Sequence, residues 1–187
     1  MVLGITETEQ ALRFEVVGCK RLSTYLTATA LTIGGVGFFL ASISSYTKNN
    51  VLPFTDATQL AFFPQGIVMG FYGVLGSLFA VYYWLTVVWD VGSGYNEFNR
   101  RTQKVTVYRN GFPGKNREIE LVYPFKSIQG VRVVLKEGLN PRRLLYLKVK
   151  GKNDIRLSGV GQPPALAVVE DQAAAIARFM DIPVDGL

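Results

Sequence analysis

The sequence predicts an α+β membrane protein in which a two-helix transmembrane hairpin is followed by a mainly antiparallel β domain with a C-terminal helix. Two long runs without Asp, Glu, Lys or Arg, residues 22–47 and 57–89, predict the hairpin. Period-two alternation of apolar and polar residues in the second half of the chain, replaced near its end by helical spacing, predicts the domain. A soluble domain of this size needs no uncharged runs of such length.

Both apolar runs are long enough to cross a bilayer, which takes about 20 residues of helix. We expect helices over about 22–45 and 64–88, the second beginning at Pro64 because proline suits a first helical turn. The first run is longer than the apolar region of a signal peptide and follows about twenty mixed residues, so it is predicted to stay as an anchor. This divides the chain into an N-terminal segment (1–21), a transmembrane hairpin (22–89) and a soluble domain (90–187).

The basic residues are distributed unevenly among these segments. Three of the 20 Lys and Arg residues precede the first run, one lies between the runs, and sixteen follow the second. Because cytoplasmic segments of membrane proteins carry the excess of basic residues, we expect a multi-pass protein with both termini on the cytoplasmic or stromal face.

Small residues recur at steps of three and four along each apolar run. Lipid provides no hydrophobic drive for helix pairing, so small residues that let two backbones approach closely are typical of helix contacts. A tight hairpin within the chain is the simpler interpretation, and a docking groove for a helix of another protein is the alternative. The glycines predicted to pack are Gly34, Gly37, Gly66, Gly70 and Gly73.

The soluble domain shows alternation typical of half-buried strands, separated by Gly, Pro and Asn turns. Strands are predicted near residues 95–100, 104–109, 118–123, 131–136, 145–150 and 155–157. After Pro163 and Pro164, helical spacing from Val169 to Met180 predicts one helix. Short connections favour antiparallel pairing, and this order fits a pleckstrin-homology-like curved sheet capped by its helix, although other small barrels fit it too.

The composition excludes most catalytic chemistry. The chain has no His and one Cys, which removes Ser-His-Asp and Cys-His catalysis, imidazole metal ligands and internal disulfides. Glu118 and Glu120 share the outward face of one strand and are interpreted as solvated surface. Cys19, beside Lys20 and Arg21, is interpreted as inert rather than as an activated thiol or a lipidation site. We expect no enzyme activity, no cofactor and no metal.

Three basic clusters are candidates for binding: Arg100 with Arg101, Lys115 with Arg117, and Arg142 with Arg143. One interpretation is a solvated face near anionic lipid, and the other is a protein-docking surface. Nucleic acid is not expected, because the exposed strand positions lack interleaved aromatic residues on which bases stack.

One loop stands out among these clusters. In the stretch NGFPGKNR (110–117), Phe112 has no place in the alternation, so it is either a buried anchor or an exposed aromatic tip between basic residues. Our hypothesis is that Phe112 and the six basic residues of the three clusters bind protein.

Several motifs together carry a resemblance to a known family. They are FFPQG (62–66) with FYG (71–73), WDVGSGYNEF (89–98), RNGFPGKNR (109–117), KEG (136–138) and RRLLY (142–146). From about Gly18 onward, the chain resembles the photosystem I assembly proteins known as hypothetical chloroplast reading frame four.

The resemblance implies a non-catalytic two-span protein of cyanobacterial or plastid thylakoids. Its stromal domain would act as a scaffold for newly made photosystem I reaction-centre subunits, with other assembly factors and thylakoid lipid as further partners. The alternative function is that of a membrane-anchored, lipid-binding pleckstrin-homology-like module.

Overall fold

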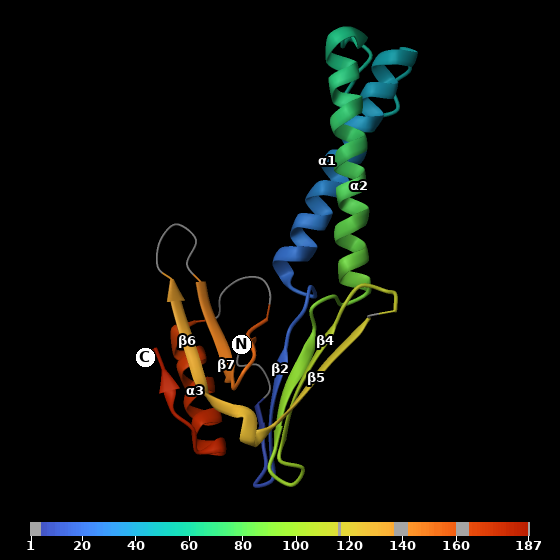
Figure 1. Ribbon diagram of the computed structural model, residues 1–187. Helices are drawn as coiled ribbons and strands as arrows, with labels where there is room; N and C mark the ends of the chain where they lie inside the picture. Colours follow the sequence, from blue (N-terminus) through green and yellow to red (C-terminus); the bar gives the residue numbers. More distant parts are fainter. Residues whose placement is uncertain (1–4, 116, 137–141, 160–164, 187) are drawn as a thin grey trace. The chain divides into compact units, whose positions relative to one another are not determined.

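The computed structural model describes residues 5–115, 117–136, 142–159 and 165–186 (Figure 1). They form two compact units: Lys20–Trp89, and the described residues up to Cys19 together with those from Asp90 onward. The sequence predicts a separate N-terminal segment over residues 1–21. In the structure, the described residues up to Cys19 belong instead to the same compact unit as those from Asp90 onward.

The first unit is a hairpin of two long helices, α1 (Leu22–Thr47) and α2 (Ile67–Val88). With the irregular helical turn Phe62–Gly66 that precedes α2, both are long and apolar enough to cross a membrane. The predicted start at Pro64 differs from the regular helix, because the backbone of Phe63 is extended (φ −106°, ψ 124°) and α2 begins at Ile67. At the other turn, Lys48 ends α1 in the left-handed conformation, and its ammonium donates to the carbonyls of Thr58 (2.9 Å) and Leu60 (3.1 Å).

The two helices approach each other through glycines. A Cβ added to Gly35 would lie 2.6 Å from the backbone nitrogen of Ser77, and a Cβ added to Gly73 would collide with the backbone of Phe39. Gly70 faces the side chain of Ser42 instead, which is able to rotate away. The backbones of α1 and α2 are therefore in contact at Gly35 and Gly73, where no side chain fits.

The predicted packing role is wrong for two of the five glycines. A Cβ added to Gly34 or Gly37 would meet no atom within 4 Å, so neither residue lies against α2. Successive residues of a helix point about 100° apart, and the residue that faces α2 is their neighbour Gly35. Polar bonds also join the hairpin: Trp84 Nε1 donates to Thr32 Oγ1 across the helices at 3.0 Å.

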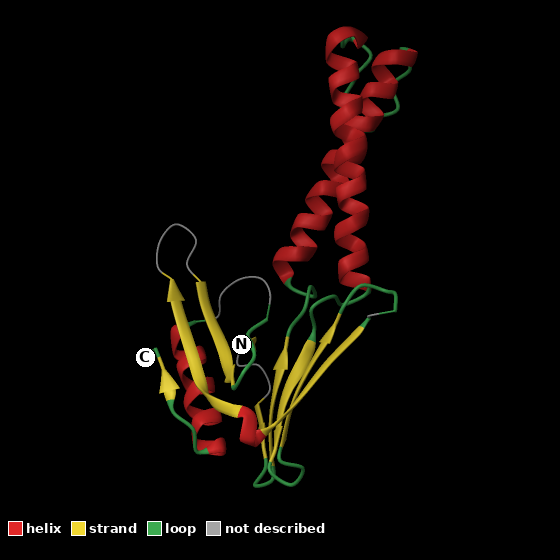
Figure 2. Cartoon of the chain, in the orientation of Figure 1, coloured by secondary structure: helices red, strands yellow, loops and turns green. Residues whose placement is uncertain are grey.

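The second unit contains two sheets, the α-helix α3 and a short 3₁₀ turn at Phe125–Ser127 (Figure 2). The first sheet is antiparallel, with the order β1 (Ile5–Glu7), β2 (Ala11–Val16), β3 (Gly94–Asn99), β4 (Lys104–Asn110) and β5 (Glu118–Pro124). The second has the order β8 (Ile155–Arg156), β7 (Arg142–Val149), β6 (Ile128–Lys136) and β9 (Val184–Asp185), of which only β9 is parallel to its neighbour. Helix α3 (Leu166–Met180) contacts β6, β7 and β9.

One hydrophobic core joins both sheets to α3. Phe98 and Val105 from the first sheet, Val131 and Leu147 from the second, and Ile176 from α3 are all almost inaccessible to solvent. The antiparallel sheets and the C-terminal helix are as predicted, and each of the six predicted strands corresponds to one of β3–β8. The pleckstrin-homology-like fold stays a prediction.

The structure adds strands that the sequence analysis missed, and β2 is the most important of them. It pairs with β3 in a register that joins Val16 to Gly94 and Ala11 to Asn99. The hairpin is therefore inserted in the chain between two neighbouring strands of one sheet. Just beyond this pair, the Cys19 N–H donates to the carbonyl of Val91 at 3.0 Å.

We expect Gly73→Ala to destabilise the protein by about 1–3 kcal/mol, because the added methyl group collides with the backbone of Phe39. Gly34→Ala is the matched control: it makes the same change on the uncovered face of α1, where alanine favours the helix. Thermal unfolding of the detergent-solubilised full-length variants measures the difference. Equal midpoints for the two variants would contradict the helix contact described above.

Candidate functional site

The predicted basic clusters lie at different ends of the five-stranded sheet. We call the end where the chain leaves toward α1 and returns from α2 the hairpin end; it comprises Val16, Gly94, Asn110 and Glu118. The opposite, turn end comprises Ala11, Asn99, Lys104 and Pro124. Lys115 and Arg117 lie in the β4–β5 loop at the hairpin end, whereas Arg100 and Arg101 follow β3 at the turn end. These two clusters therefore do not form one continuous surface.

The β4–β5 loop is held at its base by Asn110. The Asn110 N–H donates to the carbonyl of Ser93 at 2.7 Å, and the carbonyl of Asn110 accepts from the N–H of Gly92 at 2.7 Å. Its side-chain amide also donates to Ser93 Oγ at 2.9 Å. These bonds join the loop to the segment that connects α2 with β3.

The rest of the loop presents the predicted aromatic tip. The Gly111 N–H donates to the carbonyl of Arg117 at 2.6 Å and closes the loop at its base. Phe112 is 46% exposed, which excludes the buried anchor, and Lys115 and Arg117 are exposed as well. A tethered loop with an accessible ring and two cations suits recognition of an apolar and acidic surface.

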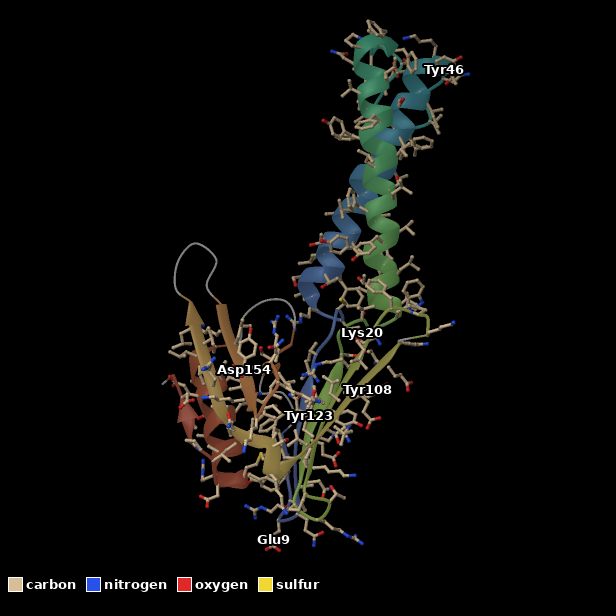
Figure 3. The ribbon with its side chains drawn as sticks, in the orientation of Figure 1. Glu9, Lys20, Tyr46, Tyr108, Tyr123 and Asp154 are labelled. Carbon is tan, nitrogen blue, oxygen red and sulfur yellow. The ribbon has the colours of Figure 1, made fainter. Side chains whose placement is uncertain are left out.

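An aromatic ladder crosses the outer face of the same sheet next to this loop. The Tyr95 and Tyr108 rings stack with centroids 5.2 Å apart, and the Arg13 guanidinium lies 3.9 Å from the centroid of Tyr95. Tyr108, labelled in Figure 3, donates to Asn110 Oδ1 at 3.0 Å. Desolvation, with a smaller contribution from the Glu118 carboxylate, raises the pKa of Tyr108, so its hydroxyl keeps its proton. The ladder thus supports the base of the loop.

Arg100 has a structural role within the domain. Its Nε and Nη2 donate to the carbonyl of Phe179 at 3.1 and 2.7 Å, and its guanidinium lies 4.3 Å from the centroid of the Phe179 ring. Phe179 lies in the last turn of α3, where carbonyls without helical partners and the helix dipole attract a cation. The side chain therefore attaches α3 to the first sheet. Arg100 is still exposed, so its proposed part in protein binding stays a prediction.

Arg101 is exposed at the turn end. It lines an open hollow of about 630 Å³ together with Arg100 and two residues of the β1–β2 turn, Glu9 and Gln10. This lining combines cations with one carboxylate and contains no pair of nucleophile and base.

The third predicted cluster begins β7. Arg143 is half-buried and lies opposite Leu135 in the β6–β7 ladder. The side chain of Arg142 is outside the described part of the chain, as are residues 137–141, so the role of this pair stays a prediction.

The sequence did not reveal the role of Arg109, a half-buried cation between the two sheets. Arg109 donates through Nη2 to Asn96 Oδ1 at 2.7 Å and to the carbonyl of Leu157 at 2.8 Å, and through Nη1 to the carbonyls of Tyr95 and Tyr108. Burial, and then the charge of Arg156, lower the pKa of Arg109 to about 10, so it remains protonated at neutral pH. Arg109 occupies the same inward-facing side of β4 as Val105 and Val107, and the alternation of the sequence already indicates this position.

No chemical site emerges among the described residues. None of their Cys, Asp and Glu side chains gather in a group of three that suits a metal ion. Glu118 and Glu120 are exposed on β5, and Cys19 is half-buried beside the β2–β3 pair. The described residues can therefore offer binding surfaces, but they show no cluster suited to metal-assisted chemistry.

Comparisons with known proteins show where this architecture recurs. The family model described as Ycf4 matches residues 9–178, which include β2, both long helices and most of α3. A protein of Synechococcus sp. (strain JA-3-3Ab) is 57% identical over 180 residues, covering 96% of this chain and 95% of the relative. Proteins of Gloeobacter violaceus and Chlorokybus atmophyticus are 56% and 51% identical, covering 98% and 94% of this chain and 98% and 93% of the relatives. All three are named photosystem I assembly protein Ycf4.

We expect Arg100→Ala to lower the stability of the full-length protein by about 1 kcal/mol, because the carbonyl of Phe179 loses two charge-assisted bonds. Arg101→Ala, the adjacent exposed residue, removes the same charge without that contact and is expected to leave stability unchanged. Denaturant titration in detergent, followed by tyrosine and tryptophan fluorescence, compares them. A larger effect for Arg101→Ala would refute the structural role assigned to Arg100.

Proposed function

The chain belongs to the Ycf4 family, and on that premise we propose that it is a non-catalytic scaffold for assembly of photosystem I in the thylakoid membrane of a cyanobacterium or plastid. The observation that carries this proposal is the extent of the match, since relatives named for this role align with nearly the whole chain, hairpin and domain alike. A scaffold acts by binding alone, and the described residues offer binding surfaces of the kind that this role requires.

A multi-pass topology with both ends on one face is part of the proposal. Strand β2 precedes α1 and β3 follows α2, yet the two strands pair along their whole length. If the helices span the membrane, the chain must cross it twice for the strands to meet. The sixteen basic residues after the second helix favour the cytoplasmic or stromal face for the domain.

Cysteine labelling tests this topology. In a Cys19→Ser background, Thr8→Cys and Asn153→Cys are expected to react with an impermeant maleimide from the same side of sealed thylakoid vesicles. Asn50→Cys, in the loop between the helices, is expected to react only from the other side. All three positions are exposed. Labelling of Thr8→Cys and Asn153→Cys from opposite sides would contradict the paired arrangement of β2 and β3.

The β4–β5 loop is the proposed contact for newly made reaction-centre subunits. Asn110 is bonded to Gly92, four residues beyond the end of α2 at Val88. Only these four residues of chain therefore separate the base of the loop from the second membrane-spanning helix in the sequence. A partner embedded in the same membrane exposes its stromal loops on the side where the chain leaves that helix. Phe112, Lys115 and Arg117 are the residues proposed to bind it.

The remaining basic residues have a smaller part in the proposal. Arg101, Arg142 and Arg143 are proposed as further protein contacts, with reaction-centre subunits or other assembly factors as partners. They lie away from the β4–β5 loop, at the turn end and at the start of β7.

A membrane-anchored lipid-binding module is the second candidate, favoured by the strand order. Without the short edge strands β1 and β9, four strands of one sheet are followed by three of the other and then by a helix, the order expected of a pleckstrin-homology-like domain. Each Lys or Arg near anionic thylakoid lipid contributes about 1 kcal/mol to attraction. The β4–β5 loop would then contact headgroups instead of protein.

We expect the double variant Lys115→Glu, Arg117→Glu to reduce recovery of photosystem I subunits with the tagged full-length protein at least tenfold. Reversal of two exposed cations opposes binding to an acidic surface without touching the core. The matched control is Lys104→Glu, Lys126→Glu, which makes the same charge change at the turn end. Mass spectrometry of material isolated from gently solubilised thylakoids measures recovery.

Two outcomes would contradict the protein contact. Equal recovery with both double variants would show that the loop is not the contact for subunits. If the loop variant keeps subunit recovery but no longer binds phosphatidylglycerol vesicles, the loop contacts lipid and the second candidate holds.

A further inference from the structure

Strand β5 forms an open edge of the five-stranded sheet. It lies last in the strand order, and within the described ranges no strand pairs with its outer side (Figure 1). The strand is seven residues long and pairs with β4 in unbroken register from Glu118 to Pro124. Natural edge strands are usually shortened, bulged or protected by charged side chains, especially Lys, or by Pro. Among the described residues the opposite edge strand, β1, has three residues, whereas β5 is longer and regular, its charged residues are acidic, and its proline stands at its end.

The bonds at the two ends of β5 show which of its backbone groups face outward. The Phe125 N–H donates to the carbonyl of Gln103 at 2.9 Å, and the Gly111 N–H donates to the carbonyl of Arg117 at 2.6 Å. In an antiparallel ladder, bonded and non-bonded pairs alternate, so the odd-numbered residues of β5 bond to β4. The even-numbered residues turn their N–H and C=O groups toward the open edge. Those with an N–H to offer are Glu118, Glu120 and Val122.

The side chains along this edge alternate in chemistry. Ile119 and Leu121, on the face that carries Val107, are 45% and 38% exposed. Glu118 and Glu120 are exposed on the other face. The domain from Asp90 onward contains sixteen basic and ten acidic residues, so β5 is an acidic strand in a basic domain.

We propose that the open edge of β5 binds an extended segment of a partner protein by strand addition, and that this segment alternates basic and apolar residues. The proposal rests on the proposed function, since the partner is a protein under assembly, and it specifies how part of that partner is recognised. Backbone bonds to the even-numbered residues supply affinity. Glu118 and Glu120 select basic side chains on one face, and Ile119 and Leu121 select apolar ones on the other.

A second copy of this chain fits the edge less well. If β5 strands of two copies pair in antiparallel fashion with Leu121 at the centre, Glu120 of one copy lies diagonally across from Glu120 of the other. Like charges at neighbouring positions of paired strands are destabilising. A segment with Lys or Arg at those positions reverses the sign of that interaction. Charge therefore favours a basic partner over self-association.

The test uses detergent-solubilised full-length protein and fluorescent heptapeptides. The probe has the alternating sequence Lys-Val-Lys-Val-Lys-Val-Lys, and a control peptide carries the same residues in two blocks. We expect tighter binding of the alternating peptide, measured by fluorescence anisotropy, and a loss of about tenfold or more with Val122→Pro. Proline there removes one outward N–H and leaves the ladder to β4 intact, because the N–H of residue 122 does not bond to β4.

The matched control is Glu7→Pro on β1, the other edge of the sheet. The reciprocal bonds between Thr8 and Ala11 place the N–H of Glu7 outward as well, so the same backbone change is made away from β5. Glu7→Pro is expected to bind the peptide as the unaltered chain does. A charge-swapped variant, Glu118→Lys with Glu120→Lys, is expected to prefer the alternating peptide made of Glu and Val. Circular dichroism checks that each variant is folded.

Three results would overturn the proposal. The first is equal binding of the alternating and block peptides, and the second is unchanged peptide binding by folded Val122→Pro. The third is a dimer in light scattering that Val122→Pro converts to a monomer, because the edge would then bind a second copy of this chain. Subunit recovery separates the two proposals. Normal peptide binding by Val122→Pro refutes only the proposed strand addition at the β5 edge. Failure of every form of the chain to recover photosystem I subunits refutes the proposed function.

Discussion

The pairing of β2 with β3 is the constraint on which the rest of the structure depends. These strands are neighbours in the sheet but are separated in the sequence by the whole helical hairpin. Five residues connect β2 to α1, and five connect α2 to β3. The connections are closely packed: Gly18 has no room for a side chain against the backbone of Ser93. Because β2 and β3 are neighbours, a segment inserted between them in the sequence must begin and end at the same end of the sheet. Two antiparallel helices meet this requirement.

The same end of the sheet contains the polar contact that holds the two sheets together. Arg109 and Asn96 both project inward from the first sheet and both donate to the carbonyl of Leu157, just after β8. The planar guanidinium reaches several acceptors at once, so its charge is solvated by carbonyls and an amide instead of a carboxylate. Asn96 alone would leave the carbonyl of Leu157 with one donor, and Arg109 supplies the second.

The sequence predicted the elements that repeat a local pattern and missed those defined by distant partners. The uncharged runs and the alternation from residue 104 onward are long enough to indicate two helices and a sheet. Strand β2 has the same alternation, in which buried Leu12 and Phe14 alternate with Arg13 and Glu15, but its partner β3 lies beyond both helices. No local pattern reveals that pairing.

The candidate residues show the same limit. Gly34, Gly35 and Gly37 look equivalent in the sequence, and the choice of Gly35 depends on how α1 is rotated toward α2. Arg100 and Arg101 are adjacent and identical in type, yet only Arg100 reaches the end of α3. In contrast, the loop around Phe112 was predictable, because glycines and a proline interrupted the alternation at that point, but the sequence left open whether the Phe112 ring is buried or exposed.

The order of synthesis gives the β2–β3 constraint a consequence for function. A chain made from its N-terminus produces β2 first, and the apolar face of β2 stays uncovered until β3 follows the second helix. Phe14 then meets Phe98, with ring centroids 6.2 Å apart, in a core that requires both strands. The base of the β4–β5 loop is bonded to residues 92 and 93, and β5 follows that loop. Both proposed binding surfaces therefore form only in a chain whose hairpin is complete, so the proposals imply that completion of the hairpin precedes partner binding by the domain.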